Sequence, residues 1–275
     1  MEAPRVMLVG APGAGKSVAA CTISKHTPEN FPDHEGMAVL EDVVYVQLEP
    51  GATKSLASVG LEVPRVIDVG DATTAKSPKN SELNINALQD TIIEVFEYIE
   101  ENVEPHEFVV FDSISTLDML TSSYFGRKYG DKAYQDYKLN NAWHGSIVQG
   151  LKSLHCGYVL VSHAKVAAPI DNADSKAHKD AKAKAESSAG KRMPGDLDIT
   201  GAAKNLYIRQ VDEILPIGVQ SVRKGKELVR QRVIHPFGND VLAGKTRFEK
   251  AVDAVEPANL RQFYNKIEVY LRGLE

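Results

Sequence analysis

The residues with the clearest chemistry form one continuous stretch near the start of the chain, Gly10-Ala11-Pro12-Gly13-Ala14-Gly15-Lys16-Ser17. This stretch matches the whole pattern of a phosphate-binding loop. In such a loop the glycines let backbone amides converge on phosphate oxygens at a helix N-terminus, the lysine reaches the β- and γ-phosphates, and the serine hydroxyl ligates Mg²⁺. We therefore predict that Gly10 to Ser17 bind a nucleoside triphosphate, with Ser17 also a ligand of the metal.

A carboxylate ends the apolar strand predicted over Phe108–Asp112. At this place a phosphate-loop protein carries the carboxylate that holds Mg²⁺ through water. The alternative is that Asp112 caps a helix that starts at Ser113. Because the phosphate loop is present, we assign Asp112 to the metal and interpret Asp118, further along the same segment, as structural.

Two more polar residues follow predicted strands. Glu49 comes directly after Val43–Leu48, and His163 directly after Tyr158–Ser162. Ligands of open parallel sheets bind at the carboxyl edge, where both side chains would project. There a carboxylate can orient or deprotonate the attacking water, and an imidazole would lie near the γ-phosphate. The alternatives are a solvated loop glutamate and a structural histidine.

The elements that must position these residues alternate between strands and helices. Apolar strands alternating with helices imply a parallel sheet covered on both faces. Near the C-terminus, two runs flanking a basic turn have the form of a β-hairpin. The predicted strands are Arg5–Val9, Val43–Leu48, Pro64–Val69, Phe108–Asp112, Tyr158–Ser162 and the hairpin Ile214–Val222 with Leu228–Ile234; the predicted helices follow Ser17 and span Leu83–Glu101, Tyr134–Leu154 and Pro257–Leu271.

The fold class predicted is therefore α/β, a mainly parallel sheet sandwiched by helices with a C-terminal β-hairpin extension. We expect a single domain over 1–275, with a core at 1–163, a loop rich in Ala, Lys, Asp and Ser at 164–203, and C-terminal strands and helix at 204–275. Cys21 and Cys156 show no metal-ligand spacing, so we expect two buried thiols. With no apolar stretch typical of a signal peptide or a membrane span, we expect a cytoplasmic protein.

Positive charge is concentrated in two stretches of a chain whose net charge is −5. From His163 to Arg192 there are seven Lys or Arg against four Asp or Glu, and from Arg223 to Lys250 there are eight against three. A uniformly negative surface would repel a polyanion. Any contact with nucleic acid is therefore expected in these two stretches.

Taken together, these motifs resemble the RecA-like P-loop ATPase core, and most closely the compact phage-type RecA-like proteins that assist single-strand annealing and homologous recombination. The resemblance rests on the order and spacing of Gly10–Ser17, Glu49, Phe108–Asp112, Asn141-Ala142-Trp143 and Leu160–Lys165. It implies a DNA-stimulated ATPase that uses ATP and Mg²⁺, in which Glu49 activates water. His163, where bacterial RecA proteins have Gln, would sense the γ-phosphate. A phage-encoded protein would act in the host cytoplasm.

The resemblance also implies partners. The family's DNA-contacting loop would span Lys165 to Arg192 and bind phosphates of single-stranded DNA without reading the sequence. A solvated tether is the alternative for this loop. The cations of Gly244-Lys245-Thr246-Arg247 resemble the pair that RecA-like proteins insert into the nucleotide site of a neighbouring subunit, which implies a homo-oligomer; a single-strand-binding protein is a further candidate partner. The DNA-binding side chains would be Lys165, Lys176, Lys179, Lys182, Lys184, Lys191 and Arg192.

Two other functions fit the phosphate loop. One is phosphate transfer to a nucleotide or other small molecule, with 164–203 as an Arg-containing lid. The poverty of that region in arginine, with only Arg192, counts against this alternative. The other is an ATP-gated interaction module whose turnover is incidental. The absence of an Asn-Lys-x-Asp tetrapeptide favours ATP over GTP by resemblance.

Overall fold

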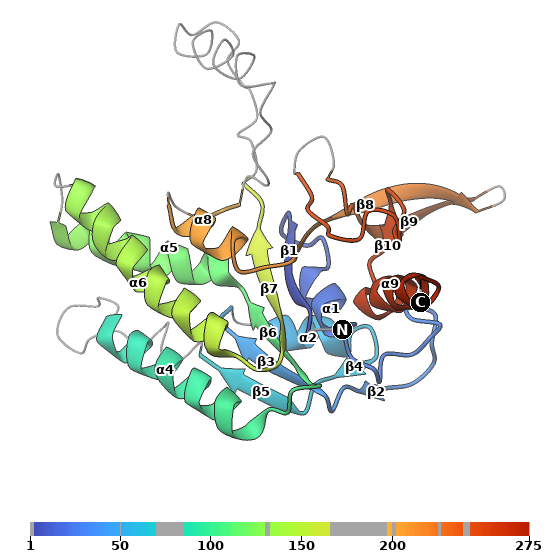
Figure 1. Ribbon diagram of the computed structural model, residues 1–275, viewed down its shortest axis with the longest axis horizontal. Helices are drawn as coiled ribbons and strands as arrows, with labels where there is room; N and C mark the ends of the chain where they lie inside the picture. Colours follow the sequence, from blue (N-terminus) through green and yellow to red (C-terminus); the bar gives the residue numbers. More distant parts are fainter. Residues whose placement is uncertain are drawn as a thin grey trace, which may run out of the picture.

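The protein is built on one twisted eight-stranded sheet. The computed structural model describes residues 3–49, 51–69, 85–129, 133–165, 197–199, 202–224, 227–238 and 243–274. In these ranges the strands of the large sheet follow the order β10-β9-β8-β1-β7-β6-β3-β5 (Figure 1). They span β1 Arg5–Gly10, β3 Val43–Gln47, β5 Arg65–Asp68, β6 Phe108–Asp112, β7 Gly157–His163, β8 Glu213–Lys224, β9 Glu227–Ile234 and β10 Glu256–Pro257.

The strand directions divide the sheet into two parts. The strands from β8 through β1, β7, β6 and β3 to β5 are all parallel, whereas β9 is antiparallel to both of its neighbours, β8 and β10. Strand β7 lies between β1, which leads into the phosphate loop, and β6, which ends in Asp112. This order, with helical crossovers and a hairpin added at one edge, is the RecA-like P-loop α/β fold. The predicted fold class is confirmed.

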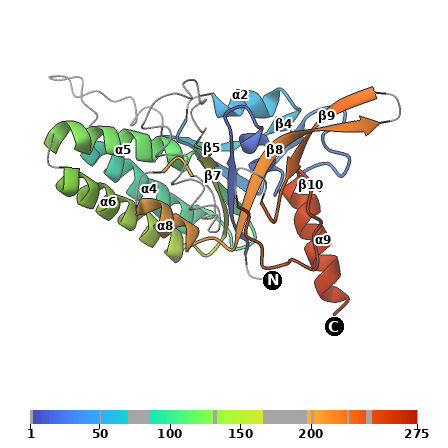
Figure 2. The same cartoon turned by 90° about the horizontal axis from the view of Figure 1, so that it is seen from above.

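Helices cover both faces of the sheet, as Figures 1 and 2 show from two directions. Helices α4, α5, α6 and α8 lie on one face, and α1, α2 and α9 lie on the other. A separate pair of short parallel strands, β2 Ala38–Val39 and β4 Leu61–Glu62, adjoins the second face. The helices span α1 Lys16–Cys21, α2 Ala52–Ala57, α4 Ile85–Asn102, α5 Ile114–Tyr129, α6 Ala133–Ser153, α8 Ala203–Ile208 and α9 Leu260–Arg272.

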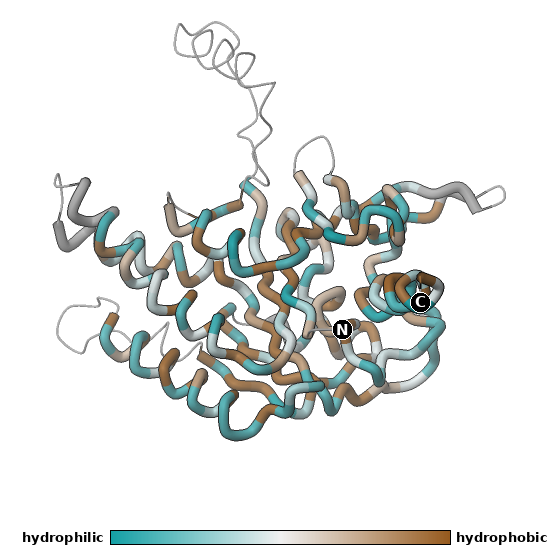
Figure 3. The backbone as a smooth tube through the Cα atoms, in the orientation of Figure 1, coloured by the Kyte–Doolittle hydropathy of each residue, from teal (hydrophilic) through white to brown (hydrophobic). Residues whose placement is uncertain are grey.

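Alternate residues of each strand supply two separate cores. In β1, Met7 and Val9 pack under α4, α5 and α6, while Val6 and Leu8 pack under α1 and α9. Because side chains on a strand alternate between faces, a strand buried on both sides is apolar at every position. Figure 3 accordingly shows the apolar colour concentrated along the central strands and mixed colours along the outer helices. None of the helices in the described ranges is both long and apolar enough to cross a membrane.

The boundaries of the predicted elements agree with the structure except near the C-terminus, but helices α2 and α5 and the short strands β2 and β4 were not predicted. The predicted helix at Pro257–Leu271 is wrong at its start, because Pro257 belongs to β10 and α9 begins only at Leu260. Asn259 caps this helix by accepting a hydrogen bond from the backbone N–H of Gln262. Helix α8 falls at the end of the predicted loop and was not expected, and 166–196 of that loop lie outside the described residues.

Both cysteines are buried free thiols, as predicted. Burial raises the pKa of Cys156 to about 11, and burial also raises that of Cys21. Neither thiol is therefore ionised at neutral pH, which fits a packing role.

Helix α4 offers a matched test of the packing. Leu88 is fully buried beneath the helix, whereas Ile93 on the same helix is 47% exposed. Leu88→Ala is expected to lower the free energy of unfolding by about 2–5 kcal/mol, because it removes buried apolar surface and leaves a cavity. Ile93→Ala is expected to cost about 0.5 kcal/mol or less. Equal losses for the two variants in urea denaturation would contradict the assignment of the buried face.

Candidate functional site

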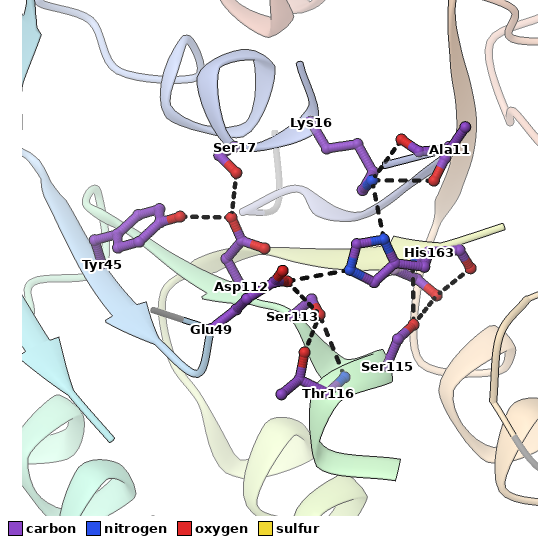
Figure 4. A network of polar contacts seen from close by, with 12 residues as sticks. Ala11, Lys16, Ser17, Tyr45, Glu49, Asp112, Ser113, Ser115, Thr116 and His163 are labelled. Atoms are coloured by element: carbon purple, nitrogen blue, oxygen red, sulfur yellow. Dashed lines mark hydrogen bonds and ion pairs between the residues drawn. The ribbon is translucent and has the colours of Figure 1, made fainter. Parts of the chain in front are cut away.

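One cleft of about 330 Å³ collects the predicted phosphate loop, Glu49, Asp112 and His163. The loop follows β1, Asp112 ends β6, His163 ends β7 and Glu49 lies just beyond β3. These four strands are parallel neighbours, so their carboxyl ends meet at one edge of the sheet. The structure therefore brings together residues that are widely separated in the sequence (Figure 4).

The backbone of the phosphate loop depends on two glycines with positive φ. Gly13 has φ 75° and Gly15 has φ 89°, both in the left-handed region that favours glycine. Gly15 is the residue immediately before α1, so the first amides of that helix face the cleft without a side chain in the way. Free amides at a helix N-terminus attract anions. This geometry has the form of the phosphate cradle that the sequence pattern predicts, and phosphate binding by these residues stays a prediction.

Lys16, the first residue of α1, is held across the cleft. Its Nζ donates to the carbonyl oxygens of Gly10 at 3.0 Å and Ala11 at 2.9 Å and lies 3.3 Å from Nδ1 of His163. Burial lowers the pKa of the Lys16 ammonium, while the carboxylates of Asp112 and Glu49 act in the opposite direction. An added phosphate would supply negative charge to this ammonium and favour its protonated form.

Asp112 is the centre of the predicted metal site. Its Oδ2 accepts a hydrogen bond from Ser17 Oγ at 2.5 Å and another from the Tyr45 hydroxyl at 2.5 Å. Burial raises the pKa of Asp112 above its ordinary value, while the two hydrogen bonds act in the opposite direction. The proposed metal pair, Ser17 and Asp112, is thus in direct contact.

The chemistry of these donors fits Mg²⁺. Mg²⁺ prefers oxygen ligands, keeps several waters and is usually held by one or two protein groups together with substrate phosphates. Ser17 offers a hydroxyl, and Asp112 offers a carboxylate beside the phosphate cradle. Within the described part of the chain no three His, Cys, Asp or Glu side chains form a group able to hold a metal. When bound, the ion would neutralise phosphate charge.

Glu49 and His163 form the second polar pair. His163 Nε2 lies 3.1 Å from Glu49 Oε2, and its other ring nitrogen faces the ammonium of Lys16. Because an ammonium only donates, Nδ1 must accept and Nε2 must carry the proton that is donated to Glu49. The hydrogen bond from His163 lowers the pKa of Glu49 despite partial burial. The result is an ionised, half-exposed carboxylate at the open side of the cleft.

The cations Lys245 and Arg247 are not in this cleft. Lys245 pairs with Ile214 near the start of β8, and its Nζ donates to the carbonyl of Val211 at 2.7 Å. Arg247 forms an ion pair of 2.6 Å with Asp212. Both lie toward the amino edge of the sheet, opposite to the phosphate loop of the same chain. A role in a neighbouring subunit's site stays a prediction.

The predicted DNA loop is described only at its ends. Lys165 is exposed directly after β7. Ala164 pairs with Leu197, and the backbone N–H of Asp198 donates to the carbonyl of His163 at 2.8 Å. The other proposed DNA-binding residues lie outside the described residues: Lys176, Lys179, Lys182, Lys184, Lys191 and Arg192.

Several residues at the site were not found from the sequence. The Tyr45 hydroxyl was hidden inside an apolar strand, and Ser113 and Ser115 follow Asp112 in the first turn of the next segment. Ser113 Oγ lies 3.5 Å from Glu49 Oε2, and Ser115 Oγ accepts the backbone N–H of His163 at 2.9 Å. Arg232 of β9 also lines the cleft, although the sequence placed it only within a basic stretch. The one available signal in the sequence was the hydroxyl of Tyr45, a polar group within an otherwise apolar, fully buried strand.

The sheet order, the phosphate cradle and the Ser17–Asp112 pair define a P-loop nucleotide-binding protein of the ATPase class. A family model described as an AAA domain matches residues 2–248, and the chain belongs to this family. Among solved structures, the chain is similar to that of a KaiC-like protein from the hyperthermophilic archaeon Pyrococcus horikoshii, with 15% identity, a TM-score of 0.43 and coverage of 93% of this chain and 85% of the other. Comparison with curated proteins gives no match.

Tyr45→Phe tests the predicted metal site. The change removes one hydrogen bond that favours ionised Asp112, so the pKa of Asp112 is expected to rise further above its ordinary value. The acid limb of Mg²⁺-dependent ATP binding should then move to higher pH, because only the ionised carboxylate holds the cation. Tyr158→Phe is the matched control, since that buried hydroxyl donates instead to the carbonyl of Gln210. An unmoved limb in Tyr45→Phe, or equal movement in the control, would contradict the assignment.

Proposed function

We propose that the protein hydrolyses ATP with Mg²⁺ and that single-stranded DNA stimulates the reaction. The observation that carries the proposal is the continuous contact from Lys16 through His163 to Glu49 (Figure 4). It places a phosphate-binding cation and an ionised carboxylate on either side of one imidazole. A water between Glu49 and a bound γ-phosphate would have a proton acceptor on one side and the reacting phosphorus on the other.

Glu49 is suited to activating that water. Its lowered pKa keeps it ionised at neutral pH, and its side chain is 45% exposed, so that water can reach it. His163 orients the carboxylate by donating from Nε2, while Ser113 approaches the same oxygen. Lys16 and the loop amides bind the phosphates, which positions the attacked group. Each role comes from a residue whose contact is described above.

Glu49→Gln is expected to lower kcat by roughly a hundredfold or more while ATP affinity stays within a few fold, because the amide can still accept hydrogen bonds but cannot take a proton. Single-turnover hydrolysis and equilibrium ATP binding measure the two effects. Glu62→Gln, on the exposed face of β4, is the control. A variant that turns over at the wild-type rate would favour the ATP-gated interaction module, in which hydrolysis has no role.

The position of the basic loop supports a link between the site and DNA. Residue 164 immediately follows His163, and the returning strand hydrogen-bonds to His163 itself through Asp198. The loop between these ends carries most of the first basic stretch. Lysines and arginines bind the phosphate backbone without reading its sequence. A change at His163 on nucleotide binding would therefore reach both ends of the loop.

The loop lysines provide the test of DNA dependence. We expect the wild-type rate of ATP hydrolysis to rise with single-stranded DNA, and the stimulation to be lost when Lys176, Lys179, Lys182 and Lys184 are all replaced by Ala. The matched control replaces four exposed lysines elsewhere, Lys25, Lys54, Lys138 and Lys152. The ratio of rates with and without DNA is measured at several salt concentrations, because phosphate contacts weaken steeply with ionic strength. Equal loss of the DNA stimulation in both variants would show that overall positive charge, and not the loop, is responsible.

Two further parts of the proposal come from the resemblance. Lys245 and Arg247 would complete the nucleotide site of a neighbouring subunit in a homo-oligomer, where added cations stabilise charge in phosphoryl transfer. The DNA-dependent activity would serve strand annealing or homologous recombination, as in phage-type RecA-like proteins. The exposed guanidinium of Arg247, 62% accessible beside Asp212, is compatible with a second contact.

A further inference from the structure

Arg232 reaches the phosphate loop from the other end of the chain. It lies on β9, and its side chain packs directly against Gly15, the residue before α1. A Cβ added to Gly15 would lie 2.4 Å from Nε and 2.5 Å from Cδ of Arg232. Only a residue without a side chain leaves room for this contact. The C-terminal hairpin therefore places a guanidinium beside the amides of the phosphate cradle.

The same arginine stands where two cavities meet. The phosphate cleft and a groove of about 570 Å³ share Gly15, Val59 and Arg232. The groove is lined partly by apolar side chains, including Val18 and Phe31. A nucleotide has a charged phosphate chain joined to a less polar nucleoside. With the phosphate chain in the cleft and the nucleoside toward the groove, the bond between the two parts would lie at the junction of the cavities.

The guanidinium of Arg232 is available for a ligand. Among the residues that the structure describes, it has neither a carboxylate within ion-pair distance nor a hydrogen-bond partner, although it is exposed beside an otherwise well-bonded site. By contrast, Arg65 is paired with Glu107 and Arg247 with Asp212, each at 2.6 Å. A guanidinium is permanently charged and presents donors in a planar fork that matches phosphate oxygens.

We propose that Arg232 binds the phosphate chain of the nucleotide from the same polypeptide as the loop, at the phosphates next to the nucleoside. The inference rests on the proposed nucleotide binding and adds a residue to that site. It assigns to the hairpin of β8 and β9 a direct contact with the ligand, distinct from the cations that the resemblance places across a subunit interface. Lys16 would hold the far end of the phosphate chain, and Arg232 the near end.

The test is equilibrium binding of ATP, ADP and inorganic tripolyphosphate to wild type, Arg232→Ala and Arg232→Lys. Arg232→Ala is expected to weaken all three ligands by about tenfold, as loss of a charge-assisted hydrogen bond implies. Arg232→Lys should recover part of the affinity. Arg209→Ala is the control, because it removes the same charge from an exposed arginine that lines neither the phosphate cleft nor the groove. Thermal melts establish that each variant is folded.

The possible outcomes distinguish a failure of the Arg232 proposal from a failure of the proposed nucleotide binding. If wild type binds none of the three ligands, the proposed function fails. If wild type binds and Arg232→Ala binds equally well or more tightly, only the role of Arg232 fails. A loss for ATP and tripolyphosphate that spares ADP would move the contact to the third phosphate and overturn the placement. An equal loss in Arg209→Ala would show an effect of overall charge and not of a contact by Arg232. Mixing Lys16→Ala with Arg232→Ala should restore no binding, and recovery would show that Arg232 serves a neighbouring subunit.

Discussion

The parallel pairing of β1, β7 and β6 is the constraint on which the site depends. In this register Gly10 lies beside His163, and Asp112 lies beside Val161. The strand between the phosphate-loop strand and the Asp112 strand therefore ends in the residue that contacts both Lys16 and Glu49. Strand β3 completes the set, since the backbone N–H groups of Leu48 and Glu49 both donate to the carbonyl of Asp112. A one-residue slip between these strands would turn the site residues into the core.

The two carboxylates of the cleft lie in different electrostatic environments. Burial raises the pKa of Asp112, whereas the hydrogen bond from His163 lowers that of Glu49. Two like groups held in different environments are a common basis for dividing chemical tasks at one site. The buried Asp112 accepts hydrogen bonds from Ser17 and Tyr45 at the edge of the cleft, which suits a cation-binding role. The exposed Glu49 is ionised and reachable by water, which suits proton transfer.

The sequence predicted those parts of the fold and site that depend on short stretches. The phosphate loop, the apolar strands and the polar residues at their ends are local patterns, and the structure places them together. Tyr45 and Arg232 could not be found in this way, because their contacts depend on which strands are neighbours and on where the C-terminal hairpin returns. The start of α9 was misplaced for a related reason: Pro257 pairs with Val233 on β9, a partner far away in the sequence.

The segment after the basic loop is tied to the core by buried polar contacts. Tyr207 of α8 lies 2.8 Å from His144 Nδ1, and the opposite nitrogen of that buried ring lies 3.1 Å from Asp118. Buried polar groups satisfied in this way rigidify the elements that carry them. One end of the loop thus begins at His163, which lines the cleft, and the other bonds back to His163 through Asp198 before the chain continues to a helix fixed against α5 and α6. A partner bound between these ends would therefore act on the cleft through the end of β7, where both ends of the loop meet.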